Sequence, residues 1–144
     1  MPISIEDRVA LEDLIVRYAT SLDACDVESV VDCFTEDCEL ETPIMGRFQG
    51  HDGIRRFAAD TGRYRAEKGG QFRHVVSNMR FKVDGEKAQI LCYLLDWLTV
   101  DGNCELLSPG EYDCEAVRTA EGWKLKSRVV KMDVKFSADR WASR

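Results

Sequence analysis

The chain of 144 residues has little histidine, little proline and no long apolar run. With two histidines and no C-x-x-C pair among its six cysteines, it offers no ligand set typical of zinc. The longest apolar stretch, residues 90–100, is broken by Asp96 and is far shorter than the roughly 20 residues of a membrane span. The first residues lack the basic and apolar regions of a signal peptide. We therefore expect a cytoplasmic protein with reduced cysteines, no metal and no membrane partner.

Basic charge is also in short supply. Lysine and arginine number 20 against 26 acidic residues, which gives a net charge of −6 at pH 7. Nucleic-acid-binding domains usually carry a basic surface, so a nucleic-acid partner is not expected. The glycine-rich, nucleophile and zinc motifs G-x-G-x-x-G, G-x-S-x-G and H-E-x-x-H are absent from the sequence. Any chemistry should therefore need no cofactor.

What is present predicts one domain over residues 1–144, helical in its first half. Apolar residues spaced by three and four predict an amphipathic helix over about residues 5–23. Asp26 is expected to cap a short second helix, and residues 35–37 to end it before a strand at 38–42. Asp52 is expected to cap a third helix over residues 53–68.

The second half has the pattern of strands joined by tight turns. Strands are predicted at residues 74–83, 88–100, 104–119 and 123–136, the third interrupted by a turn at 108–110. The Asp-Gly and Glu-Gly pairs between them favour hairpins. The result is an antiparallel meander of long strands, hence strongly twisted, in an α+β fold.

The segment Ile90 to Leu98 lacks the alternation of a half-exposed strand, so both of its faces should be covered. The three helices can cover one face. No helix remains in the sequence for the other, and a second subunit is the simplest cover. We therefore expect a homo-oligomer, a dimer or a trimer.

Two residues are candidates for acid–base chemistry. His74 begins the first long strand, and Asp23 ends the apolar face of the first helix where no capping role explains it. A carboxylate beside an imidazole can orient the ring and stabilise its charged form. A purely structural His74 and an exposed Asp23 remain open at this stage. His51 is explained by its position before a helix.

Candidates for a binding pocket are aromatic. Tyr18 lies on the apolar stripe of the first helix, and its hydroxyl needs a partner if it is buried. Tyr93, Trp97 and Tyr112 lie on strands and could line a pocket. Arg118 continues the alternation that begins at Tyr112, which would place a buried guanidinium beside small side chains. The sequence does not fix which face of each strand points inward.

The order of several short motifs resembles SnoaL-like proteins. These motifs are Ile5-Glu6-Asp7, Leu14 to Asp23, Phe34 to Cys38, Phe48 to Ile54, Arg73 to Asn78, Gly110 to Asp113, Arg118 and Gly122 to Leu125. The resemblance spans about residues 4–135. It implies the nuclear-transport-factor-2-like fold, a cone-shaped, strongly curved antiparallel sheet closed by three N-terminal helices around a pocket.

The resemblance also implies a chemistry. In the scytalone-dehydratase, hexachlorocyclohexane-dehydrochlorinase and bile-acid-dehydratase branches, an Asp–His dyad performs elimination, and its members are similar to Asp23 and His74. A tyrosine five residues before the aspartate, similar to Tyr18, occurs in the bile-acid branch. These likenesses imply a lyase in which His74 is the base, Asp23 fixes its tautomer, and Tyr18 or Tyr112 donates to the departing oxygen or to a developing enolate. The absence of cofactor motifs and the apolar residues of the strands favour a cofactor-independent reaction on a small, apolar, cyclic substrate, with Tyr93, Trp97, Tyr112 and Arg118 as substrate-binding residues.

Three alternatives stay open. A polyketide cyclase or an isomerase would use the same dyad, because both begin with the same deprotonation. The fold also serves non-catalytic ligand-binding and assembly domains, and fold alone does not decide function. A third is the small subunit of a ring-hydroxylating oxygenase, which would require a large partner chain.

Overall fold

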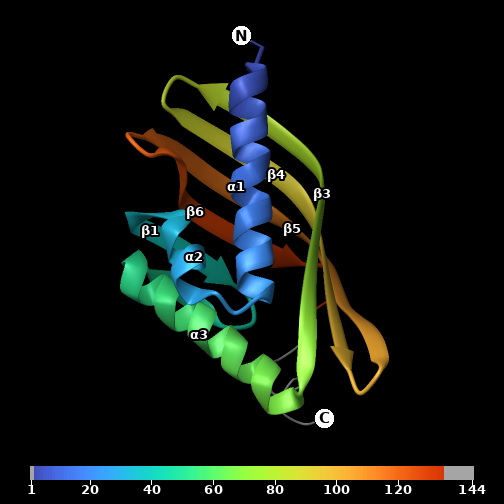
Figure 1. Cartoon of the computed structure of the whole chain (residues 1–144). Helices are drawn as coiled ribbons and strands as arrows, with labels where there is room; N and C mark the ends of the chain where they lie inside the picture. The colour runs from blue at the N-terminus through green and yellow to red at the C-terminus, as the bar shows by residue number, and fades with distance from the viewer. Residues whose placement is uncertain (1, 135–144) are drawn as a thin grey trace.

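The computed structural model describes residues 2–134, which form a six-stranded sheet and three helices (Figure 1). The elements are α1 (Ile5–Asp23), α2 (Val27–Asp32), β1 (Phe34–Thr42), β2 (Gly46–Gln49), α3 (Gly50–Lys68), β3 (Gly70–Asp84), β4 (Lys87–Val100), β5 (Asn103–Thr119) and β6 (Gly122–Met132). The predicted α+β fold, with helices in the first half and a meander in the second, is confirmed.

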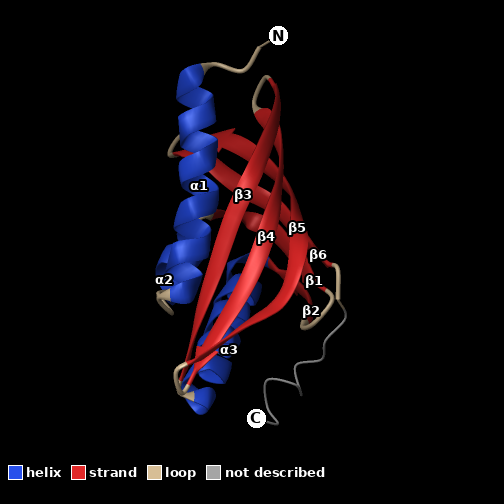
Figure 2. Ribbon diagram, turned by 90° about the vertical axis from the view of Figure 1, so that its right-hand side faces the viewer, coloured by secondary structure: helices blue, strands red, loops and turns tan. Residues whose placement is uncertain are grey.

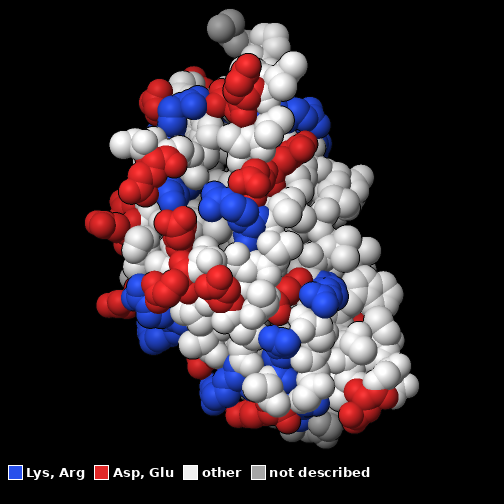
Figure 3. Space-filling view, viewed as in Figure 1, with Lys and Arg blue, Asp and Glu red and all other residues white. Residues whose placement is uncertain are grey.

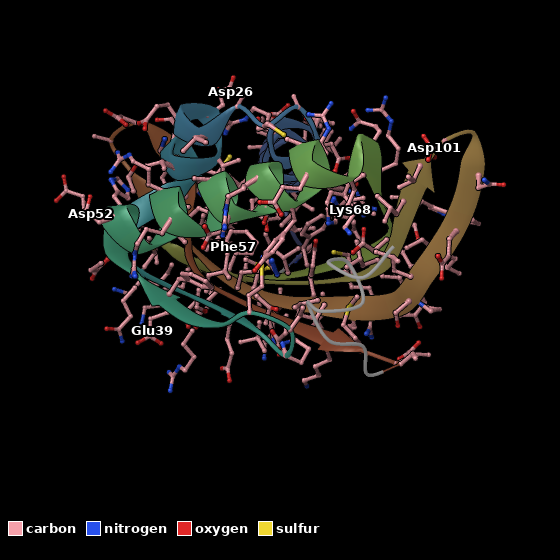
Figure 4. All side chains as sticks on the ribbon, turned by 90° about the horizontal axis from the view of Figure 1, so that it is seen from below. Asp26, Glu39, Asp52, Phe57, Lys68 and Asp101 are labelled. Carbon is pink, nitrogen blue, oxygen red and sulfur yellow. The ribbon has the colours of Figure 1, made fainter. Side chains whose placement is uncertain are left out.

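The strands lie in the order β2-β1-β6-β5-β4-β3. Neighbours are antiparallel except β1 and β6, which run parallel. The three helices lie on one face of the curved sheet, as the side view and the view from below show (Figures 2 and 4). Phe57 of α3 points toward the sheet, whereas Glu39 of β1 points away from the helices (Figure 4). This is the cone-like arrangement that the motifs implied.

The first helix forms where its sequence predicts. Ser4 caps α1 by accepting a hydrogen bond from the Asp7 backbone N–H at 3.0 Å. Its apolar stripe is buried against the sheet. Asp26 caps α2 as expected, since its side chain accepts from the Ser29 N–H at 3.2 Å. Because α1 begins after Ser4 and packs along the sheet, its last residue, Asp23, lies beside strand β3.

Three local predictions were wrong. Residues 35–37 continue strand β1, which begins at Phe34. Helix α3 begins at Gly50, so Asp52 lies in its first turn and caps nothing; Gln49 holds the cap position without a side-chain hydrogen bond. Strand β5 runs unbroken through residues 108–110. Gly110 permits this because a Cβ there would lie 2.7 Å from the Lys131 carbonyl oxygen of β6. The part of the last predicted strand beyond residue 134 lies outside the described residues.

The two faces of β4 differ although its sequence does not alternate. Ile90, Cys92 and Leu94 are buried under the helices. Tyr93 points to the other face and is 53% exposed.

Within the described residues, no helix is long and apolar enough to span a membrane. On the helix-bearing face, acidic and basic side chains are interspersed (Figure 3).

Candidate active site

A pocket lies between the C-terminal end of α1, helix α3 and the inner face of the sheet. Its cavity volume is about 40 Å³, and it opens to solvent on one side. Its apolar lining is Leu22, Ile44, Met45, Phe57, Phe72, Leu94, Val130 and Met132; its polar lining is Thr42, Thr61, His74, Asp96, Tyr112 and Arg128. An apolar cavity with a few convergent polar groups is the usual form of a small-molecule site.

Asp23 holds His74 by two hydrogen bonds. The backbone N–H of His74 donates to Asp23 Oδ2 at 2.9 Å, and Nδ1 of the ring lies 2.5 Å from Asp23 Oδ1. Both side chains are nearly buried: that of His74 is 10% exposed and that of Asp23 is 7% exposed. Because the carboxylate accepts at Nδ1, the neutral ring carries its proton there and its lone pair on Nε2. The free nitrogen is therefore the one on the opposite side of the ring from Asp23.

A second carboxylate faces that nitrogen. Asp96 Oδ1 lies 3.5 Å from His74 Nε2, and the two residues are paired across β3 and β4. Asp96 is 4% exposed, and among the described residues its Oδ1 has no hydrogen-bond partner. Burial raises the pKa of Asp96, and the nearby Asp23 adds to this, against the lowering effect of His74 and Arg128.

The neighbouring carboxylates shift the pKa of His74 in the direction opposite to the effect of burial. Burial alone would lower the pKa of this histidine, but the charges of Asp96 and Asp23 and the hydrogen bond to Asp23 outweigh it. The pKa of His74 is therefore raised above its ordinary 6.5. Because His74 and Asp96 face each other directly, their protonation is coupled.

Arg128 of β6 supplies the positive charge of the pocket. It is 3% exposed, and its guanidinium carbon lies 4.6 Å from the ring centre of Tyr112 and 5.0 Å from that of Tyr18. Its Nε and Nη1 have no hydrogen-bond partner among the described residues. A buried cation held by aromatic rings with free N–H groups can receive an oxygen that gains negative charge.

The two tyrosines have different places. Tyr112 lines the pocket, as predicted from its strand. Tyr18 is fully buried, stands edge-on to Tyr112 with ring centres 6.2 Å apart, and is not among the lining residues. Burial raises the pKa of Tyr18 to about 12. The structure therefore does not place Tyr18 where the expected proton donor would stand; its ring packs against the Arg128 guanidinium on the side away from the pocket.

Gln71 and Arg65 brace the turn that carries Asp23. The Gln71 side-chain amide donates to the Asp23 carbonyl oxygen at 2.9 Å. Arg65 donates to the Gln71 side-chain oxygen at 2.6 Å and to the Cys25 sulfur at 2.9 Å. The end of α1 is thereby tied to the beginning of β3, next to His74.

Three residues expected to line the pocket do not. Tyr93 and Trp97 lie on the face of β4 that points away from the helices, because alternation puts them on the opposite side from Leu94 and Asp96. Arg118 lies beyond the end of the core, where it donates to Asp7 at 2.8 Å and covers the Trp123 ring. His51, half-buried in the first turn of α3, lies 2.9 Å from the Phe34 carbonyl oxygen, which accounts for it structurally.

Sequence reasoning missed Asp96 and Arg128. The signal for Asp96 was its position: one acid within the apolar run of β4, on the same alternation as Ile90, Cys92 and Leu94. Arg128 has the corresponding position in β6, two residues before the buried Val130.

No group of three or more histidine, cysteine or acidic side chains within residues 2–134 is arranged to hold a metal ion.

Comparison with known proteins places the fold in a family. Residues 4–129 match the SnoaL-like domain, and the chain belongs to that family. An uncharacterized protein of Mycobacterium tuberculosis is 25% identical over 129 residues, covering 87% of this chain and 84% of that protein.

Two solved structures share the architecture. An NTF2-like protein from Novosphingobium aromaticivorans superposes with a TM-score of 0.81 at 24% identity, covering 94% of this chain and 88% of that one. A scytalone dehydratase-like protein from the same organism gives a TM-score of 0.76 at 20% identity, covering 90% and 86%. At these identities the likeness shows the NTF2-like fold. Enzymes occur in the family and among such neighbours.

Proposed function

We propose that this protein is a cofactor-independent lyase of the dehydratase type. The observation that carries the proposal is the buried series Asp23–His74–Asp96, which ends at an apolar pocket beside Arg128. Dehydration needs a base for a carbon-bound proton and an acid for the departing hydroxyl group. His74 and Asp96 offer these two groups side by side.

In the reactive form His74 is neutral and Asp96 is protonated. His74 Nε2 removes a proton from the carbon next to a substrate carbonyl, and the electron pair moves toward the carbonyl oxygen. As the carbon–oxygen bond at the next carbon breaks, Asp96 gives its proton to the hydroxyl, and water leaves. The imidazolium then returns its proton to the Asp96 carboxylate. Base catalysis of this kind supplies roughly 10²–10⁴-fold in rate.

Two other groups assist this sequence. The Asp23 carboxylate keeps the proton of the neutral ring on Nδ1 and stabilises the imidazolium. Free N–H groups of Arg128 stabilise the oxygen that becomes negative. The proposed substrate is a mostly apolar, cyclic molecule with a hydroxyl group two carbons from its carbonyl carbon, and the apolar lining with its few polar groups favours this polarity.

The test uses two assays with small probes. Dehydration of 3-hydroxycyclohexanone to 2-cyclohexenone and of 3-hydroxy-1-tetralone to 1-naphthol is followed by the ultraviolet absorbance of each product. Exchange of the proton next to the carbonyl of 1-tetralone, which has no leaving group, is followed by NMR in D₂O. We expect both reactions with the wild-type chain and neither with His74→Gln. His51→Gln, the other histidine, is the matched control and should retain both.

The outcomes separate the proposal from its rivals. Exchange without dehydration would overturn the dehydratase assignment in favour of an isomerase or cyclase, since these begin with the same deprotonation. Absence of both reactions, with tetralones still bound in the pocket, would overturn it in favour of a binding protein. Equal activity in wild type and His74→Gln would remove His74 as the base.

A further inference from the structure

Two threonine hydroxyls line the pocket away from the groups that the proposed reaction uses. Thr42 is the last residue of β1 and Thr61 lies in α3; both are buried, and both line the pocket. Strands β6 and β5 lie between β1 and β4, the strand that carries Asp96. Thr42 and Asp96 are thus three strand spacings apart across the sheet, each spacing being about 4.8 Å. The pocket therefore has a second polar side, opposite the side of His74 and Asp96.

The hydroxyl of Thr42 has a donor without an acceptor. Its Oγ1 accepts from the backbone N–H of Ile44 at 3.0 Å and from that of Met45 at 3.2 Å. A hydroxyl has one donor hydrogen and two acceptor lone pairs, so the turn that follows β1 occupies both lone pairs. The hydrogen remains, and within residues 2–134 no acceptor takes it. Thr42 therefore offers the pocket a hydrogen-bond donor.

The hydroxyl of Thr61 has the complementary arrangement. It donates to the Phe57 carbonyl oxygen at 2.9 Å, one turn earlier in α3, and lies 3.9 Å from Met45 Sδ. Its hydrogen is thereby used, whereas its lone pairs accept from none of the described groups. Met45 contacts both threonine hydroxyls, so the donor and the acceptor lie in the same part of the pocket.

We propose that Thr42 and Thr61 form a binding site for a substrate hydroxyl group that takes no part in the reaction. One hydroxyl oxygen can accept from Thr42 and donate to Thr61. A carbonyl or carboxylate oxygen brings no hydrogen for Thr61, and an ammonium group brings no lone pair for Thr42. The substrate is therefore a cyclic hydroxyketone with a further hydroxyl at the end opposite its reacting carbons.

This inference rests on the proposed function, which places the reacting carbons at His74. The hydroxyl site then fixes which end of the substrate faces the base. A site built to hydrogen-bond a hydroxyl discriminates against an analogue without one, because its buried polar groups are then left unpaired. Thr42 and Thr61 should therefore determine specificity, and their effect should appear in binding alone.

The test measures dissociation constants of the wild-type chain for tetralones that have no leaving group. The probes are 1-tetralone, 6- and 7-hydroxy-1-tetralone, and 6- and 7-fluoro-1-tetralone; their substituents lie on the ring away from the reacting carbons. Fluorine is close to a hydroxyl in size but cannot donate a hydrogen bond. We expect at least one hydroxy compound to bind at least about fivefold more tightly than its fluoro counterpart and than 1-tetralone.

Valine variants keep the shape of the side chain and remove the hydroxyl. Thr61→Val and Thr42→Val should each abolish the preference for the hydroxy compound and leave the affinity for 1-tetralone little changed. Thr61→Ser should retain the preference. Thr42→Val also removes the acceptor of two backbone N–H groups, so circular dichroism checks its fold, and Thr61→Val decides the outcome if that chain does not fold.

The matched control is Thr20→Val. Thr20 donates to the Val16 carbonyl oxygen at 2.8 Å, the same bond within a helix that Thr61 makes, but it is exposed on α1 and does not line the pocket. This variant should retain the full preference for the hydroxy compound. Loss of the preference in Thr20→Val as well would show an effect of the helix bond and would contradict a hydroxyl site at Thr61.

The remaining outcomes are equally distinct. Equal binding of the hydroxy and fluoro compounds, or binding of no tetralone, would overturn the proposal. So would a preference that persists in Thr61→Val, because the hydroxyl would then lie elsewhere. A preference that depends on both threonines, without dehydration of 3-hydroxy-1-tetralone, would contradict the proposed function and leave the hydroxyl site standing. Dehydration without the preference would contradict the hydroxyl site alone.

Discussion

Helix α1 carries a carboxylate at each end that bonds to the sheet, and the two ends differ in what surrounds that carboxylate. Asp7 accepts from Arg118 at 2.8 Å and from Trp123 at 2.9 Å. Asp23 accepts from the ring and backbone of His74, which also faces Asp96. At the Asp7 end the charges are matched and partly solvated; at the Asp23 end two buried carboxylates lie near one imidazole.

The difference indicates what each end is for. The hydrogen bonds from Trp123 and Arg118 lower the pKa of Asp7, as in an ordinary stabilising contact. At the other end, Asp96 and Arg128 have buried polar atoms without partners among the described residues. Unsatisfied buried polar groups cost stability, so they are expected where a ligand completes them. The Asp7 end has the contacts of a stabilising ion pair, whereas the Asp23 end has the unpaired groups that the proposed proton transfer requires.

The largest effect on turnover is expected when His74, the proposed base, and Asp23, which orients it, are replaced singly and together. His74→Gln should lower turnover by roughly 10²–10⁴-fold. Asp23→Asn should also impair turnover, because an amide can hold the wrong tautomer and cannot balance the imidazolium. The double variant should be little worse than His74→Gln, since residues that act as a unit are not additive. Losses that multiply in the double variant, in chains folded by circular dichroism, would contradict the dyad.

Replacing Asp96 separates acid from base. Asp96→Asn should lower dehydration by about 10²-fold or more while retaining proton exchange on 1-tetralone. Because the charge of Asp96 raises the pKa of His74, its removal should let His74 become neutral at lower pH. The acid limb of the exchange profile should then move to lower pH. A shift to higher pH, or parallel loss of both reactions, would remove Asp96 from the acid role.

A smaller effect is expected at the brace of the active end. Gln71→Met keeps the size of the side chain but loses the donor to the Asp23 carbonyl oxygen. Misplacing Asp23 slightly should lower kcat by less than about 10²-fold with KM little changed. A rise in KM at constant kcat would show that Gln71 acts on substrate binding. Circular dichroism controls for a change in fold.

The Asp7 end should affect stability alone. Asp7→Asn is expected to lower the melting temperature slightly at pH 7 and to leave turnover unchanged. Because the pKa of Asp7 in the folded chain lies below 3.8, its contribution is present above that pH and is lost as the pH falls further. The difference between wild type and variant should therefore vanish in acid. Reduced turnover in Asp7→Asn would abolish the contrast between the two ends.

Much of the fold followed from local patterns. The spacing of apolar residues predicted α1, and the turn residues predicted the meander, because each is a property of neighbours along the chain. The start of α3 was missed because Asp52 resembles a cap, whereas the chain enters the helix through Gly50 with a φ of +67°.

The pocket was harder to predict because it depends on which face of each strand is covered. Strand β4 is apolar on both faces, so the alternation of its residues does not show whether Leu94 or Tyr93 faces the helices. Alternation correctly places Arg118 on the same face as Tyr112, but at Arg118 this face of β5 is no longer buried. Asp23 and His74 were candidates from their positions in the sequence, the resemblance to a family favoured them as a pair, and the packing of α1 on β3 brings them together.

The most direct test of the account is an NMR titration of the histidine rings. The chain has only two histidines, and His51→Gln assigns them. We predict that His74 titrates above 6.5, carries its proton on Nδ1 when neutral, and titrates lower in Asp96→Asn. Titration at or below 6.5 that Asp96→Asn and Asp23→Asn leave unchanged would contradict the claim that two carboxylates hold this ring for proton transfer.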